Sequence, residues 1–154
     1  MIATTLENYL RYMQVPFEVL PHPKAMTSLR SASAAHIPAH QMAKAVVLED
    51  ETGYVMAVVP ADRRVHLGAL REQLGRTMGL ATEPELGTVF KDCALGAIPP
   101  LGAAYGIESV VDDELREGSE IYFEAGDHEE MVRMRREDFL RLLGPARHGH
   151  FCRH

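Results

Sequence analysis

Lys44 is the first residue of this chain whose type and position suggest chemistry. Only three of the 16 basic residues are lysines, and Lys44 stands at the head of the apolar run Ala45-Val46-Val47-Leu48. A lysine is costly to bury unless its ammonium group has a partner or a task. Lys44 could extend its charged end from a strand into water, or it could project into a pocket and hold an anion.

The second candidate is the stretch from Leu95 to Gly102, which reads LGAIPPLG. Two prolines between two glycines exclude a regular helix or a central strand. We therefore expect a stiff loop that holds its backbone polar groups in place, while glycine permits a close approach. The residues predicted to line a binding site here are Gly96, Ala97, Ile98, Pro99, Pro100 and Gly102.

Three further side chains have both a structural and a functional interpretation. His22 could contact a ligand or cap its own turn, and Thr27 could contact a ligand or cap the helix that follows it. For these two we favour the structural role. His128 follows the turn Gly126-Asp127. It could donate to a ligand or lie in water as a turn residue, and the sequence does not separate the two.

Other groups with reactive side chains are given structural roles. His148, His150 and Cys152 near the C-terminal end are of metal-ligating type, but their spacing fits neither a zinc finger nor a tight chelating loop. Cys93 is interpreted as a small buried hydrophobe and not as a nucleophile. The run Asp112-Asp113-Glu114 is interpreted as a solvated acidic turn. Neither a Gly-x-Ser-x-Gly elbow nor a His-Glu-x-x-His motif occurs.

The elements that must position these residues follow from periodicity and from turn residues. Helix and strand patterns alternate irregularly and include a hairpin at Glu49–Gly53, which favours a mixed α/β domain over a regular βαβ winding. Helices are predicted at 5–14, 29–36, 65–74, 82–90 and 137–143, and strands at 17–20, 44–48, 54–59, 78–81, 107–111, 120–125 and 131–135.

Length and composition indicate a single domain. The 154 residues, 46% of them hydrophobic, suit one core over residues 1–144, with residues 145–154 as a flexible tail. No apolar run is long enough for a membrane span, and no secretory signal is evident, so we expect a cytoplasmic protein without membrane contact. Two cysteines are too few for a disulfide framework.

Charge is distributed unevenly along the chain. Residues 1–77 carry 8 basic and 7 acidic side chains, and residues 78–154 carry 8 and 15, which gives +1 and −7 and sums to the net −6. This balance argues against extensive contact with a phosphate backbone, which needs clustered lysine and arginine. Contact with one end of a nucleic acid remains compatible with it.

Four features occur together in a definite order: His22 to Thr27 after the first strand, Lys44 at the head of an apolar strand, the Gly96–Pro100 loop, and Gly126 to His128. In this order and at these separations, the chain resembles the YbaK/prolyl-tRNA editing family of aminoacyl-tRNA deacylases over residues 5–143. The resemblance implies a compact α/β domain with a mixed, barrel-like sheet flanked by helices.

The resemblance also implies a function. It implies hydrolysis of the ester between a wrongly attached amino acid and the terminal adenosine of a tRNA, with no metal or cofactor and with an association with a synthetase. Lys44 would be the functional lysine, and the Gly96–Pro100 loop would line the aminoacyl pocket. We expect this loop to form the opposite wall of the same pocket into which Lys44 points. Ala97 and Ile98 would narrow that pocket, which favours a small amino acid such as alanine. The alternative is a non-catalytic module that binds aminoacyl-tRNA or a nucleotide in a regulatory assembly.

Overall fold

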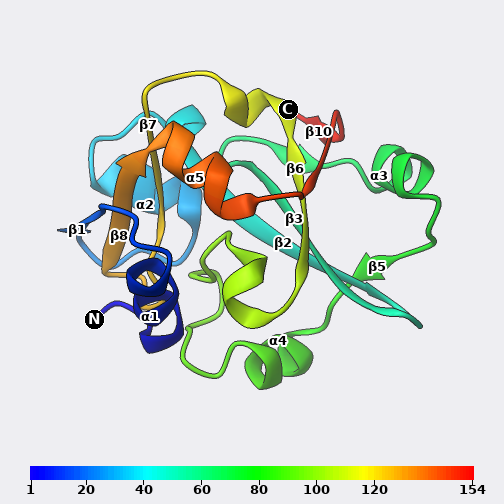
Figure 1. The fold of residues 1–154 in the computed structure, drawn as a ribbon, viewed down its shortest axis with the longest axis horizontal. Coiled ribbons are helices and arrows are strands. Elements are labelled where there is room, and N and C mark those ends of the chain that lie inside the picture. The colour runs from blue at the N-terminus through cyan, green and yellow to red at the C-terminus, as the bar shows by residue number, and fades with distance from the viewer.

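The computed structural model describes residues 1–154, which form five α-helices packed against a mixed sheet (Figure 1). The helices are α1 (Thr4–Tyr12), α2 (Ser28–Ala34), α3 (Leu67–Leu74), α4 (Glu83–Val89) and α5 (Arg136–Leu143). The strands are β1 (Glu18–Pro21), β2 (Met42–Asp50), β3 (Gly53–Pro60), β4 (Arg64–Val65), β5 (Gly79–Leu80), β6 (Glu108–Asp112), β7 (Glu120–Glu124), β8 (Glu130–Arg135), β9 (Arg147–Gly149) and β10 (Cys152–Arg153). None of the helices has the length and apolar character that crossing a bilayer requires.

The main sheet runs in the order β1-β8-β7-β2-β3-β6-β9, with β5 paired to β2 beside this path. The β2–β3 hairpin forms its middle and pairs antiparallel from Ala43–Pro60 to Asp50–Gly53. The β2–β7, β3–β6 and β6–β9 pairs are parallel, and the remaining pairs are antiparallel. A separate ribbon joins β4 to β10. The sheet is therefore mixed, as predicted.

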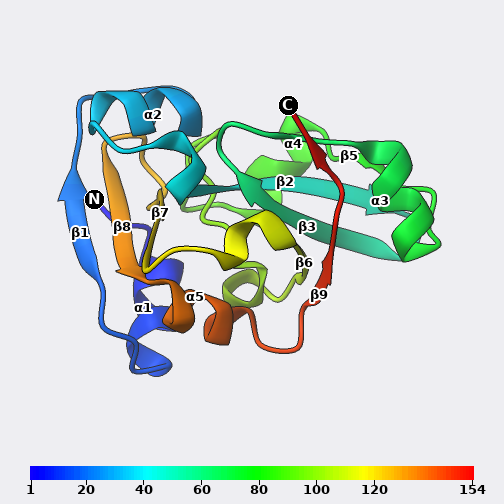
Figure 2. The ribbon, with the colours of Figure 1, turned by 90° about the horizontal axis from the view of Figure 1, so that it is seen from above.

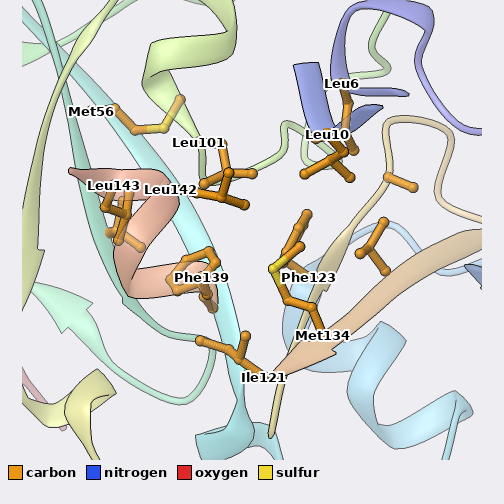
Figure 3. Close-up of a cluster of buried hydrophobic side chains, with 14 of the residues drawn as sticks. Leu6, Leu10, Met56, Leu101, Ile121, Phe123, Met134, Phe139, Leu142 and Leu143 are labelled. Carbon is orange, nitrogen blue, oxygen red and sulfur yellow. The ribbon is translucent and has the colours of Figure 1, made fainter. Parts of the chain in front are cut away.

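Side chains that alternate along the strands build cores on both faces of the sheet. The largest core lies under α1 and α5, where residues such as Leu6, Phe123 and Phe139 meet (Figure 3). A second core packs α3 against the hairpin through Leu70, and a third lies beneath α2 at Ala32. Figure 2 shows α2 on one side of the β1–β8–β7 part of the sheet, with α1 and α5 on the other.

One edge of β2 is left open in its middle. β7 pairs with β2 only at Met42 and Ala43, and β5 pairs with it only at Leu48 and Glu49. Residues 44–46 therefore have no strand beside them on the edge away from β3, and the Val47 carbonyl accepts from the Ala81 N–H at 3.0 Å. Because no strand covers residues 44–46, a ligand could reach both the backbone and the side chains of a central strand here.

The fold confirms the mixed α/β prediction, and the predicted helices and strands occur with shifted ends. The C-terminal residues differ from the predicted flexible tail. β9 extends the main sheet through β6, β10 pairs with β4, and Phe151 between them is fully buried. Apolar burial of Phe151 and backbone pairing on both sides of it hold this segment in place.

The acidic run at 112–114 also differs from its predicted role as a solvated turn. Asp112 is 1% exposed, and its Oδ2 accepts hydrogen bonds from the backbone N–H groups of Phe151 and Cys152 at 2.8 and 2.9 Å. Its Oδ1 accepts a third from the Glu114 N–H at 2.9 Å. A carboxylate can satisfy several backbone donors at once, so Asp112 fastens the C-terminal segment to the end of β6.

Candidate functional site

An apolar pocket of about 250 Å³ opens at the unpaired edge of β2. Seven of its nine lining residues are hydrophobic, and Ser28 at the start of α2 contributes the one hydroxyl group. The remaining lining residues come from β2, from the segment around β5 and α4, and from the proline loop: Ala45, Val46, Val47, Leu80, Ala81, Leu86, Gly96 and Ile98. The pocket is smaller than the roughly 300–1,000 Å³ of sites for drug-sized ligands, so it suits a small apolar group.

The proline loop forms one wall of this pocket, and its shape depends on Gly96. Gly96 has φ +82°, and a Cβ atom there would lie 2.7 Å from the Met26 carbonyl oxygen and 3.1 Å from Cε1 of His128. Any larger residue would be strained in its backbone and crowded by its neighbours. Glycine is therefore required for the loop to lie this close to the segment before α2.

Only part of the predicted loop site faces the pocket. Gly96 and Ile98 line it, whereas Ala97, Pro99, Pro100 and Gly102 are buried beneath the surface. Gly102 packs against β6, where its N–H donates to Ser109 Oγ at 3.2 Å and a Cβ atom would lie 2.5 Å from the Ile107 carbonyl oxygen. These four residues support the loop, and the prediction that they contact a ligand is not met by their positions.

The loop also presents backbone donors. The Ala97 N–H donates to the Ala94 carbonyl at 3.1 Å, so it is occupied. The N–H groups of Gly96 and Ile98 donate to no group of the protein. Two unpaired donors on a stiff loop at the edge of an apolar pocket are suited to bind a carbonyl oxygen or an oxyanion.

A second, cationic pocket of about 230 Å³ contains Lys44 and Arg64, together with Val46, Val65, Leu67 and Leu80. Lys44 is half-buried, and this burial is the main cause that lowers its pKa. The nearby carboxylate of Asp62 opposes this effect and raises the pKa, whereas the positive charge of Arg64 lowers it. The guanidinium of Arg64 donates to the His154 carbonyl at 3.0 Å, which ties it to the C-terminal ribbon. Two neighbouring cations in a partly desolvated groove favour an anionic ligand.

The two pockets adjoin each other across the open edge of β2. Val46 and Leu80 line both, so these two residues form the ridge between them. We had expected Lys44 and the proline loop to face one pocket. The structure differs because alternation along β2 sends Lys44 to the α3 side of the hairpin and its neighbour Ala45 to the loop side.

The two predicted histidines are both buried behind the loop. His22 is 8% exposed, and its Nδ1 lies 2.8 Å from the Pro23 carbonyl oxygen, which agrees with the predicted turn role. His128 is 2% exposed, so the interpretation as a turn residue in water is wrong; its Nε2 donates to the Leu95 carbonyl. Thr27 caps α2 by accepting from the Arg30 N–H at 3.2 Å.

Sequence reasoning missed Glu124, which lies beside both histidines. Its side chain is 1% exposed, and Oε1 lies 3.7 Å from Nε2 of His22. Burial raises the pKa of Glu124, while the Ser31 hydroxyl and the two histidines lower it. A glutamate that ends a β-strand is ordinary in a sequence, so only the fold reveals that this carboxyl group is enclosed.

The residues of metal-ligating type near the C-terminal end hold that segment in place and do not form an open metal site. Ligand atoms of Asp112, Glu114 and Cys152 lie within 4.8 Å of one another, and this donor set could hold a transition metal. However, Asp112 already accepts three backbone hydrogen bonds, and burial, with the adjacent carboxylates, raises the pKa of the Cys152 thiol. Cys93 is similarly inert, because burial raises its pKa to about 12.

The chain is similar to known proteins in both sequence and fold. A family described as "Aminoacyl-tRNA editing domain" matches residues 22–142. A solved structure of a candidate trans-editing enzyme for prolyl-tRNA synthetase superposes with a TM-score of 0.85 at 22% identity, covering 99% of this chain and 97% of that one. No curated protein sequence matches the chain.

Two further structures show the same fold. An uncharacterised protein superposes with a TM-score of 0.85 at 18% identity, covering 97% of this chain and 99% of that one. A candidate signal transduction protein from Marinobacter aquaeolei superposes with a TM-score of 0.79 at 22% identity, covering 99% of this chain and 31% of the larger one. The fold thus occurs both as a chain of this length and inside a longer protein.

Proposed function

Because the chain belongs to the aminoacyl-tRNA editing domain family, we propose that it hydrolyses the ester bond of a mischarged aminoacyl-tRNA in trans. The observation that supports this activity best is the pair of adjoining pockets, one apolar and one cationic, on the two sides of the β2 edge. The 3′ end of a charged tRNA has the matching chemistry, with an aminoacyl group at one end of the terminal nucleotide and a phosphate at the other.

In this arrangement the cations bind the terminal nucleotide. The ammonium group of Lys44 and the guanidinium of Arg64 hold the phosphate, and the ribose lies across the ridge formed by Val46 and Leu80. Fixing the nucleotide at one pocket directs its ester toward the other. Most of the rate enhancement then comes from positioning the ester for attack by water.

The proline loop acts on the ester itself. A water oxygen attacks the carbonyl carbon, and the developing oxyanion accepts hydrogen bonds from the N–H groups of Gly96 and Ile98, which have no other partner. The bond between the carbonyl carbon and the ribose oxygen then breaks, and the ribose oxygen takes up the proton that the attacking water gives up. The vicinal ribose hydroxyl assists this transfer, as the family resemblance implies.

The size of the apolar pocket favours a small amino acid such as alanine. Val47 and Ile98 both line the pocket, and its volume of about 250 Å³ leaves room for a short side chain. We further propose that the protein acts in the cytoplasm, binds the tRNA only at its acceptor end and works beside a synthetase. The net charge of −6 supports this limited contact with tRNA.

A screen of charged tRNAs tests the activity. Each of a set of aminoacyl-tRNAs is incubated with the full chain, and release of the amino acid is followed above the spontaneous rate. Turnover is expected with a tRNA that carries a small amino acid and not with one that carries a large aromatic one. Failure to hydrolyse any charged tRNA would contradict the proposal.

One observation favours the alternative, a binding module without catalysis. No titratable side chain lines the apolar pocket, and Ser28 is its one residue with a polar side chain. The same screen separates the two functions, because a module would bind an aminoacyl-tRNA saturably and leave its ester intact.

A further inference from the structure

A group of buried polar side chains gathers behind the proline loop. Eight buried side-chain nitrogen and oxygen atoms in the protein have no hydrogen-bond partner, and five of them belong to four residues: His22, Ser31, Glu124 and His128. None of the four is more than 8% exposed. Because unpaired polar atoms are costly to bury, such a concentration in one place is a feature that calls for a physical account.

The partners of the two histidines fix part of their protonation. Nδ1 of His22 lies 2.8 Å from a carbonyl oxygen, and Nε2 of His128 contacts another, the carbonyl of Leu95. A carbonyl oxygen only accepts, so each of these two nitrogens carries a hydrogen. The opposite nitrogen of each ring faces the interior, and in His22 it faces Glu124.

Glu124 and His22 face each other without a hydrogen bond, because Oε1 of Glu124 and Nε2 of His22 lie 3.7 Å apart. An isolated charge at this depth is unfavourable. Burial raises the pKa of Glu124, which favours its uncharged carboxyl form. His128 and Asp127 are the other titratable groups that act on Glu124.

This group lies behind two neighbouring segments that line the apolar pocket. His128 donates to the carbonyl of Leu95 and lies against Gly96, which lines the pocket. Ser31 lies beside Glu124, and Ser28, three residues earlier in α2, lines the pocket next to the loop, since the Cβ position of Gly96 is 2.7 Å from the Met26 carbonyl oxygen. His128 itself has φ +67°, an unusual backbone conformation for a residue other than glycine, and a tight turn holds it there.

We propose that Glu124 and His22 act, with His128, as a buried positioning unit that holds the proline loop against the start of α2. They do not touch the substrate. Glu124 keeps His22 and α2 in place, and His128 keeps the loop in place, so the N–H groups of Gly96 and Ile98 stay where an ester can meet them.

The first test measures wall positions without using the activity. Amide resonances of ¹⁵N-labelled full chain are compared for wild type, Glu124→Leu and Glu124→Gln. Glu124→Leu should shift the resonances of Ser28, Gly96 and Ile98, whereas Glu124→Gln, which keeps the shape and the polar end of the side chain, should shift them less than half as much. The matched control is Glu120→Gln on the same strand, which is exposed and should leave all three unchanged.

The histidine rings give a second readout in wild-type protein, which is useful if Glu124→Leu fails to fold. From pH 6 to 8, Nδ1 of His22 and Nε2 of His128 should both have the ¹⁵N shift of a protonated nitrogen. An unprotonated signal at either nitrogen would overturn the arrangement. So would wall resonances that remain unchanged when Glu124→Leu is folded.

The kinetic test rests on the proposed deacylase function. Glu124→Leu should lower kcat at least tenfold with KM changed less than threefold, and Glu124→Gln should stay within threefold of wild type, since misplacing donors affects the chemical step more than binding. Wild-type kcat in folded Glu124→Leu would overturn the positioning role and leave the function intact. An inactive wild type with the expected spectra would overturn the function alone.

Discussion

Lys44 and Ala45 are adjacent in sequence, but their side chains lie in different pockets on opposite faces of β2. Alternation along a strand makes this arrangement unavoidable, and in the proposed function one ligand reaches both faces across the open edge between β7 and β5. The two residues thus divide the proposed work, with Lys44 gripping the nucleotide and Ala45 forming the floor of the aminoacyl pocket.

Replacing Lys44 tests its role in binding phosphate. A hydrogen bond to a charged group contributes about 1.5–3 kcal/mol, so Lys44→Ala should lower kcat/KM by roughly 10- to 150-fold. The free energy of unfolding should stay the same or rise slightly, because the variant removes a half-buried charge. Steady-state deacylation and thermal unfolding check both parts. Unchanged deacylation would show that Lys44 does not contact the substrate.

The lowered pKa of Lys44 predicts a pH dependence with a definite sign. Burial holds its pKa below the ordinary value of 10.5, so the folded protein loses this proton at lower pH than the unfolded chain. Between the two values the unfolded state binds more protons, and this group therefore makes the unfolding free energy rise with pH. As the pH rises through the same range, Lys44 loses its charge, and the affinity of the protein for phosphate should fall.

This effect is isolated by the affinity of the protein for an acceptor-stem minihelix that carries no amino acid, because such an RNA has no ester to hydrolyse. The affinity is measured from pH 7 to 10.5. Wild type should lose affinity before pH 10.5. Lys44→Arg should keep its affinity over this range, since a guanidinium stays protonated. A parallel loss in Lys44→Arg would assign the titration to another group.

Gly96→Ala should damage both stability and the pocket. The positive φ and the Met26 carbonyl 2.7 Å from the Cβ position predict a loss of about 1–3 kcal/mol in unfolding free energy, with a displaced loop. Gly87→Ala in α4 is the matched control, because nothing lies within 4 Å of its Cβ position, and it should stabilise by about 0.5–1 kcal/mol. Chemical denaturation of both variants measures the contrast. Equal stabilities would show that the Gly96 loop adapts freely.

Asp112→Ala should loosen the C-terminal ribbon. The substitution leaves three backbone N–H groups without an acceptor, and we expect a loss of about 3 kcal/mol or more in unfolding free energy. Asp113→Ala serves as control, since its ion pairs with His148, His150 and Arg116 are near the surface and should contribute about 0–1 kcal/mol. Denaturant unfolding followed by circular dichroism compares the two. Similar losses would contradict the fastening role of Asp112.

The binding of tRNA should depend weakly on salt. If Lys44 and Arg64 together neutralise about two phosphates of a single strand, the slope of log affinity against log salt is about −1.4. A minihelix should then be hydrolysed nearly as well as whole tRNA. A slope several times steeper, or a minihelix that is inert while whole tRNA is hydrolysed, would indicate contacts far from the acceptor end.

Sequence patterns predicted the elements of the fold because these depend on local features. The hairpin at 49–53 and the capping of α2 by Thr27 both follow from residues close together in the chain. The side of the sheet on which Lys44 lies could not be predicted. It depends on which segments cover each face of β2, and α3 and the proline loop, which do so, come later in the chain.

The strand pairing of the C-terminal segment and the burial of Glu124 could not be predicted from the sequence for a related reason. Arg147 to Gly149 contains no residue that favours a strand, and it pairs only because β6 offers a free edge and Asp112 accepts from the segment that follows. The residues next to Glu124 in the sequence do not indicate that its side chain is buried. Its enclosure arises from α2 and the β1 and β8 segments, which only tertiary packing brings together.

The open edge of β2 also has a consequence for the newly made chain. The β2–β3 hairpin is a local structure that can form within microseconds, whereas β7 must arrive from about 80 residues away before it can cover Met42 and Ala43. Until then, a long strand that includes Val46, Val47 and Leu48 has an uncovered edge, which can pair with another chain. The edge that admits a ligand in the finished protein is therefore the place where an unfinished one is most prone to aggregate.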